Sequence, residues 1–156
     1  MIVKGPLMYD RILLPTDGSD GTETAVEQAI EHAKTYDAEL HVLHVIDQSV
    51  VDLSGTPASG GVTADMLREQ LDDEGQTHVE TVAAQATQAG VPTTTEVVDY
   101  GHPHEKITSY ATDHGIDLIV LGTHGRSGID RHLLGSVAEK VIRTAEVPVL
   151  AVQLAE

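Results

Sequence analysis

The feature that most constrains the fold is a regular alternation of two hydrophobic periods along the chain. Apolar residues recur every three or four positions in four segments, which predicts helices over residues 21–36, 63–89, 103–114 and 136–145. Short apolar runs between them predict buried strands over residues 9–16, 38–47, 91–100, 117–122 and 147–153. This alternation favours an α/β fold in which a parallel sheet carries helices on both faces.

The longest predicted helix, residues 63–89, contains one weak position. Its apolar face is formed by Leu67, Leu71, Val79, Val82 and Ala86. Gly75 lies in the middle of this segment, and glycine costs about 1 kcal/mol relative to alanine inside a helix. The preceding residues 48–62 hold three serines, three glycines and a proline, which predicts a loop.

The chain of 156 residues has no internal repeat and no linker long enough to separate domains. We expect a single domain over residues 8–153, preceded by an extension of residues 1–7. The absence of cysteine excludes thiol catalysis, thiolate zinc sites, iron–sulfur clusters and disulfides. No apolar run approaches the roughly 18 residues of a membrane span, and the first residues do not form a signal peptide. We therefore expect a soluble, cytoplasmic protein with no membrane partner.

The formal net charge of −16 arises from 25 acidic residues against 9 basic ones, spread along the whole chain. Because 40% of the residues are hydrophobic, this composition indicates a folded domain with an acidic surface rather than a disordered acidic segment. Such a surface is typical of proteins from halophiles, since at about 1 M salt the Debye length is only about 3 Å. An ordinary acidic mesophilic protein is the alternative. No basic stripe is present, which disfavours nucleic acid as a partner.

Two turns are candidate ligand sites, because doubly wound sheets bind ligands beyond the carboxyl ends of their strands. One follows residues 9–16. The other follows residues 117–122 and reads Gly122-Thr123-His124-Gly125-Arg126-Ser127-Gly128, with Gly135-Ser136 opening the next helix. Glycines allow close approach to a polyanion, and a helix N-terminus offers unpaired N–H groups to phosphate.

A purely structural role for these residues remains an alternative. Neither the Walker P-loop pattern nor the dinucleotide pattern G-x-G-x-x-G occurs. Ser136 and Glu139 have the spacing of a capping box, so the serine could serve its own helix.

The pattern Gly122-x2-Gly125-x9-Gly135-Ser136 resembles the signature of the universal stress protein family, in its ATP-binding branch. The resemblance extends from Met8 to Gln153 and includes the opening Pro15-Thr16-Asp17. It implies a Rossmann-like open five-stranded parallel sheet of order 3-2-1-4-5. In that order, the first and fourth strands are neighbours, so both candidate turns would border one crevice.

The resemblance also implies a role for individual residues. Asp17, next to Pro15 and Thr16, matches a contact to the adenosine, and the backbone of Val45 matches a contact to the adenine edge. The residues matching contacts to the ribose and phosphates are Gly122, Gly125, Gly135 and Ser136. ATP, or another adenine nucleotide, would be accompanied by Mg²⁺ or Mn²⁺.

Within the glycine loop, Thr123, His124 and Arg126 could also meet the nucleotide. Arg126 supplies positive charge near the phosphates, although a loop arginine is often only solvated. His124 could reach a phosphate or hydrogen-bond the backbone of its own loop.

Two other chemistries receive less support. His41 and His44 lie three apart in a predicted strand and so face opposite sides, and no third ligand accompanies His102 and His104. A metal site on histidines is therefore disfavoured. Asp17 is also placed like the nucleophile of some phosphatases, but the second aspartate two residues later is missing.

The apolar last strand is expected at a sheet edge, and the resemblance implies a homodimer through residues 147–153. The leading hypothesis is an ATP-binding stress-response regulatory or protective module, with at most slow ATP hydrolysis. The alternatives are a nucleotide-processing enzyme on the same fold and a protein-interaction module that binds no nucleotide.

Overall fold

The computed structural model describes residues 9–16, 23–46, 64–98, 102–123 and 136–153. Its strands are β1 (Arg11–Thr16), β2 (Glu39–Val45), β3 (Thr93–Val98), β4 (Leu118–Gly122) and β5 (Val149–Val152). Its helices are α1 (Glu23–Tyr36), α3 (Ala64–Gln88), α4 (Pro103–Asp113) and α5 (Ser136–Thr144). Each predicted helix and strand is therefore present, with ends that differ by a few residues.

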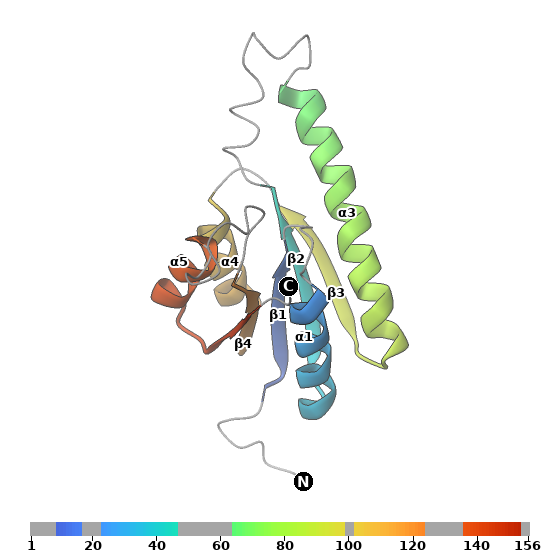
Figure 1. Ribbon diagram of the computed structural model, residues 1–156, viewed down its shortest axis with the longest axis vertical. Helices are drawn as coiled ribbons and strands as arrows, with labels where there is room; N and C mark the ends of the chain where they lie inside the picture. The colour runs from blue at the N-terminus through green and yellow to red at the C-terminus, as the bar shows by residue number, and fades with distance from the viewer. Residues whose placement is uncertain (1–8, 17–22, 47–63, 99–101, 124–135, 154–156) are drawn as a thin grey trace.

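The five strands form one parallel sheet of order β3-β2-β1-β4-β5, which confirms the predicted order (Figure 1). β1 is the central strand, and the order reverses between β1 and β4. β5 is shorter than the predicted strand over residues 147–153. Pro148 directly precedes β5 and has no N–H group to donate to a neighbouring strand, which is why the strand begins only at Val149.

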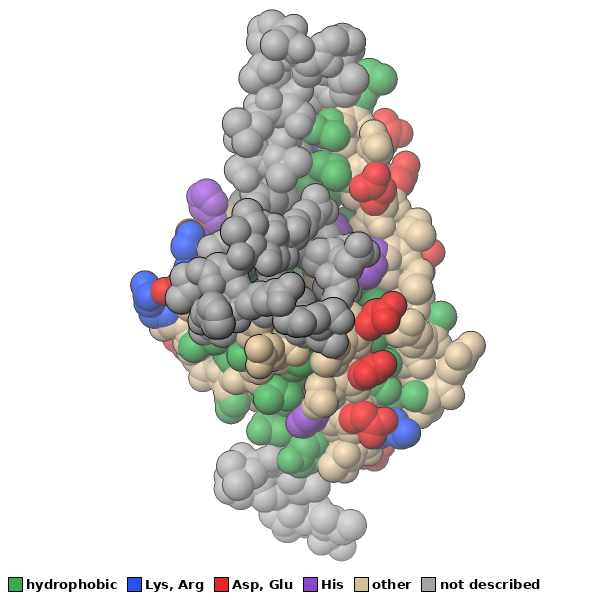
Figure 2. Space-filling model, in the orientation of Figure 1, with side chains coloured by type: hydrophobic (Ala, Val, Ile, Leu, Met, Phe, Trp, Pro, Cys, Tyr) green, Lys and Arg blue, Asp and Glu red, His purple; other side chains and the backbone are tan. Residues whose placement is uncertain are grey.

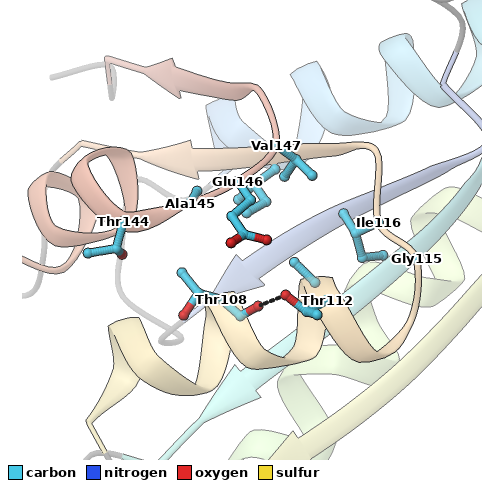
Figure 3. Close-up of a pocket in the computed structure, with 10 residues that line it drawn as sticks. Thr108, Thr112, Gly115, Ile116, Thr144, Ala145, Glu146 and Val147 are labelled. Carbon is cyan, nitrogen blue, oxygen red and sulfur yellow. Dashed lines mark hydrogen bonds between the residues drawn. The ribbon is translucent and has the colours of Figure 1, made fainter.

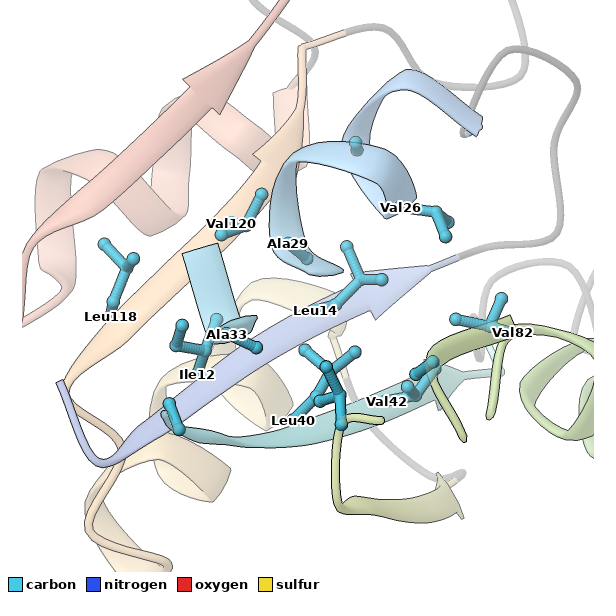
Figure 4. Packing of buried hydrophobic residues seen from close by; sticks show 14 of the residues in the cluster. Ile12, Leu14, Val26, Ala29, Ala33, Leu40, Val42, Val82, Leu118 and Val120 are labelled. Carbon is cyan, nitrogen blue, oxygen red and sulfur yellow. The ribbon is translucent and has the colours of Figure 1, made fainter. Parts of the chain in front are cut away.

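The two faces of the sheet bury separate apolar clusters, because successive side chains in a strand point to opposite sides. Ile12 and Leu14 of β1 pack with α1 and α3, whereas Leu13 between them packs with α4 and α5. Figure 4 shows the first cluster, in which Ala29 and Ala33 bring α1 close to the strands. The prediction of helices on both faces is confirmed.

Helix α3 is longer than the strands that it covers. It packs mainly on β2 and β3 through Val79, Val82 and Ala86. Its amino-terminal half extends past the carboxyl edge of the sheet (Figure 1), where Leu67 and Leu71 are half-buried. None of the described helices is long and apolar enough to cross a membrane.

Candidate functional site

The carboxyl ends of β1 and β4 form the edge where the strand order reverses. β1 pairs with β2 along its whole length, whereas its ladder with β4 joins Ile12 to Leu118 and Leu13 to Ile119. The pairing of β1 with β4 thus stops before the carboxyl ends of the two strands. In doubly wound sheets, the ligand crevice lies just outside the carboxyl ends of the strands at such a switch point.

The glycine signature coincides with the elements that border this edge. Gly122 is the last residue of β4 and Ser136 is the first residue of α5, so the signature spans the connection between them. The other described members of the predicted site lie at strand ends: Pro15, Thr16, Val45 and Thr123. The remaining predicted contacts lie outside the described residues: Asp17, His124, Gly125, Arg126 and Gly135.

Backbone hydrogen bonds show which main-chain groups at this edge are already engaged. The N–H of Thr123 donates to the Val152 carbonyl over 3.0 Å, which occupies that amide within the sheet. In β2, the N–H of Ile46 donates to Val98 of β3 over 2.8 Å. Because main-chain groups alternate along a strand, those of Val45 turn the other way, toward β1.

A polar contact joins α3 to the end of β1. Thr16 Oγ1 and His78 Nε2 share a hydrogen bond of 2.6 Å, in a part-buried position. His44 is the register partner of Thr16 in β2, and its ring lies edge-on to that of His78 with centroids 6.2 Å apart. Three polar side chains therefore meet where β1 and β2 end.

Gly75 makes room for this cluster. A Cβ atom built on Gly75 would lie 2.6 Å from Cδ2 of His44, a separation that real Cβ atoms essentially never show. The helix continues through this residue without a break. The sequence marks Gly75 as a weak point of the helix; the structure shows that it is the position where α3 admits the His44 ring.

His78 is the residue at this edge that the sequence did not single out. One signal was available, since helical spacing places His78 beside Val79 and Val82 on the buried side of α3. A histidine within an apolar stripe needs polar partners, and Thr16, 62 positions earlier, is one of them here.

A second cluster lies near the opposite, amino edge of the sheet. His41 Nε2 is paired with the carboxylate of Glu39, and His41 Nδ1 bonds the Tyr110 hydroxyl over 2.7 Å. A carboxylate only accepts hydrogen bonds, so the neutral imidazole carries its proton on Nε2, and Nδ1 accepts from the tyrosine. The Tyr110 ring also stacks on His114, with centroids 3.7 Å apart.

Burial governs the titration of this cluster. Desolvation lowers the pKa of His41 below 6.5 and outweighs the opposite effect of Glu39. Desolvation also raises the pKa of Tyr110 to about 12, with Glu96 and Glu39 adding to the shift. Both groups are therefore neutral at pH 7, and the tyrosine is a poor nucleophile.

The histidines do not assemble a metal centre among the described residues. His41 contacts α4 and His44 contacts α3, which confirms that they face opposite sides of the sheet. The rings of His102 and His104 stack with centroids 6.1 Å apart. The described residues contain no group of three or more histidine, aspartate or glutamate side chains that could hold a metal ion.

A hollow of about 360 Å³ lies between α4 and the end of α5 (Figure 3). It is placed toward the amino edge, because Ile116 and Val147 of its lining precede β4 and β5. The hydroxyls of Thr112 and Thr144 donate to carbonyls of their own helices. This hollow is separate from the edge where the glycine signature lies.

The chain is similar in sequence to known proteins. A model of the universal stress protein family matches residues 8–153. The chain is 41% identical to universal stress protein MJ0531 of Methanocaldococcus jannaschii over 98% of its own length and 87% of that protein. It is 34% identical to universal stress protein YxiE of Bacillus subtilis, over 94% of this chain and 100% of that protein.

Solved structures agree with this assignment. That of MJ0577 from M. jannaschii superposes with a TM-score of 0.82 at 31% identity, covering 96% of this chain and 99% of that one. A universal stress protein solved in complex with cAMP, 24% identical with a TM-score of 0.67 over 95% of this chain and 99% of that one, shares the fold. From its sequence and its architecture, the chain belongs to the universal stress protein family.

Proposed function

We propose that this protein binds an adenine nucleotide, ATP with Mg²⁺ or Mn²⁺, at the carboxyl edge between β1 and β4. In this proposal it acts in the cytoplasm as a nucleotide-dependent regulatory or protective module. The observation that carries the proposal is the position of the signature, which begins where β4 ends at Gly122 and closes where α5 begins at Ser136. Nucleotide binding in doubly wound folds uses this kind of strand-to-helix connection.

The chemistry of the edge suits an anionic ligand in an acidic protein. With a net charge of −16, the chain has few cations to offer, so backbone N–H groups and the ligand's own divalent cation must balance the phosphates. The amino terminus of α5 supplies such N–H groups together with the positive end of the helix dipole. We assign the phosphates to this terminus and to Gly125, and the adenosine to Asp17 and the backbone of Val45.

The fold itself is compatible with such ligands. Proteins that share it have been solved in complex with cAMP and with dAMP, at 24% and 20% identity. We further propose that hydrolysis of ATP is slow at most, because the sequence places no evident general base to activate a water molecule.

Calorimetric titration of Mg-ATP into the purified protein tests the proposal. The titration is run in molar KCl, so that repulsion between the acidic chain and the nucleotide is screened. We expect saturable binding near one nucleotide per chain. We expect Gly125→Val to abolish binding, because a branched side chain at this signature glycine prevents the close approach to phosphate that glycine allows.

Thr112→Val, on α4 near the opposite edge, is the matched control and should bind as the unmodified protein does. A folded unmodified protein that gives no saturable heat would overturn the proposal. Equal binding by the Gly125→Val variant would show that nucleotide is bound elsewhere.

A further inference from the structure

At the carboxyl edge of the sheet, the end of β1 contacts helix α3. The segment from β4 to α5 that contains the signature glycines begins at the same edge. α3 covers β2 and β3, and the hydrogen bond between His78 Nε2 and Thr16 Oγ1 also joins this helix to the central strand. Thr16 is 8% exposed, and as the last residue of β1 it directly precedes Asp17. His78 is therefore hydrogen-bonded to the side-chain hydroxyl of the residue that directly precedes the proposed nucleotide contact.

The position of His78 is fixed from the side of α3 as well. Its neighbour Val79 is fully buried in the core, and Gly75, one turn earlier, receives the ring of His44. These two contacts fix the backbone of α3 on either side of His78, so the helix is placed to present the His78 side chain to Thr16. Loss of this bond removes one of the contacts that hold the end of β1.

We propose that His78 is a positioning residue for the nucleotide crevice: through Thr16, it holds the end of β1 in the geometry that nucleotide binding needs. This inference rests on the proposed function and adds a residue of α3 to it. His78 itself does not touch the nucleotide. Because coupling between two sites is reciprocal, bound nucleotide must in turn stabilise the contact between α3 and β1.

Two substitutions of similar polarity separate the hydrogen bond from other effects. The terminal amide of glutamine reaches about as far as Nε2 of histidine, whereas that of asparagine reaches about as far as Nδ1. His78→Gln can therefore restore the bond to Thr16 Oγ1 and His78→Asn cannot. Thr77→Ala, an exposed position on the same turn, is the control.

The dissociation constant of Mg-ATP is measured by calorimetry in molar KCl, and the free energy of unfolding is measured without nucleotide. We expect His78→Asn to weaken nucleotide binding about five- to tenfold, the loss that corresponds to about one hydrogen bond. His78→Gln and Thr77→Ala should bind within about twofold of the unmodified protein. In the unmodified protein, Mg-ATP should also slow amide hydrogen exchange over residues 75–82 of α3.

The outcomes distinguish this inference from the proposed function. An unmodified protein that does not bind Mg-ATP overturns both. Normal nucleotide binding by His78→Asn overturns the inference alone, and so does equal weakening by the Gln and Asn variants. If either variant fails to fold, the hydrogen-exchange measurement decides, because unchanged exchange in α3 contradicts the coupling.

Discussion

At the scale of single residues, the buried pair of His41 and Tyr110 makes stability depend on pH. The pKa of His41 is lowered in the folded protein, mainly by desolvation, while the unfolded chain titrates near 6.5. Below that pH the unfolded state binds more protons than the folded state. The stability associated with neutral His41 is therefore fully present above pH 6.5 and decreases as the pH falls below it.

We predict that the free energy of unfolding decreases from pH 7 to pH 5 more in the unmodified protein than in His41→Gln. Urea denaturation at both pH values measures the difference, and comparing slopes cancels the titration of the many carboxylates. An equal decrease in the free energy of unfolding for His41→Gln and the unmodified protein would contradict a lowered pKa of His41.

At the scale of elements, the contact of α3 with the sheet reverses the usual effect of alanine in a helix. By propensity alone, Gly75→Ala would stabilise α3 by about 1 kcal/mol. We predict instead a destabilisation of about 1–3 kcal/mol, because the new methyl group would displace the His44 ring. Urea denaturation measures the change, and Gln76→Ala on the exposed side should lie within about 0.5 kcal/mol of the unmodified protein.

The combination of Gly75→Ala with His44→Ala supplies the internal check. Without the imidazole ring, the alanine at position 75 has room, so the same substitution should become stabilising in that background. A Gly75→Ala protein more stable than its parent would show that α3 does not approach β2 as closely as described.

Elements were predictable where one local pattern decides them. The apolar runs of β1 and β4 are short, bounded and buried on both faces, so their strands and the parallel sheet follow from the sequence. The strand order came from the family resemblance, because no local pattern states which strands are neighbours. The contacts of His78 with Thr16 and of His41 with Tyr110 were missed, since they join residues 62 and 69 positions apart.

For the candidate site, the sequence predicted the position of the glycine segment but not the contacts that α3 makes there. Spacing alone located the glycine connection after β4, and the structure confirms that Gly122 and Ser136 bound it. The proposed part of Asp17 and Gly125 in ligand binding stays a prediction. Whether a polar residue such as His78 supports the site depends on how closely α3 approaches β1, which spacing does not encode.

At the scale of the whole molecule, β5 offers the sheet edge through which two copies could pair. The carbonyls of Pro148 and Val152 accept from β4, so alternation turns the N–H and C=O groups of Val149 and Ala151 outward. We propose that these groups form the homodimer interface. Ala151→Pro removes one outward N–H without touching the ladder to β4, and we predict that it converts a dimer into a monomer.

Sedimentation velocity in molar KCl measures this change. Ala151→Thr keeps the N–H group and should remain dimeric. A monomeric unmodified protein, or a dimeric Ala151→Pro variant, would contradict pairing through β5.

Charge is also a property of the whole molecule. In Figure 2, acidic side chains are scattered over α1 and α3 on the face shown. Such a distribution adds long-range repulsion between copies, which salt screens. Association through β5 should for this reason be measured in molar KCl, as in the nucleotide titration.

The central place of β1 affects how the molecule forms during synthesis. Backbone N–H groups of Asp10 and Arg11 bond the side chain of Asp117, more than a hundred positions later in the chain. A ribosome therefore releases β1, α1, β2, α3 and β3 well before β4 exists. Until then, the apolar β1 keeps one edge unpaired and prone to aggregation. The proposed crevice needs β4 and α5, so a product truncated before them is expected not to bind nucleotide.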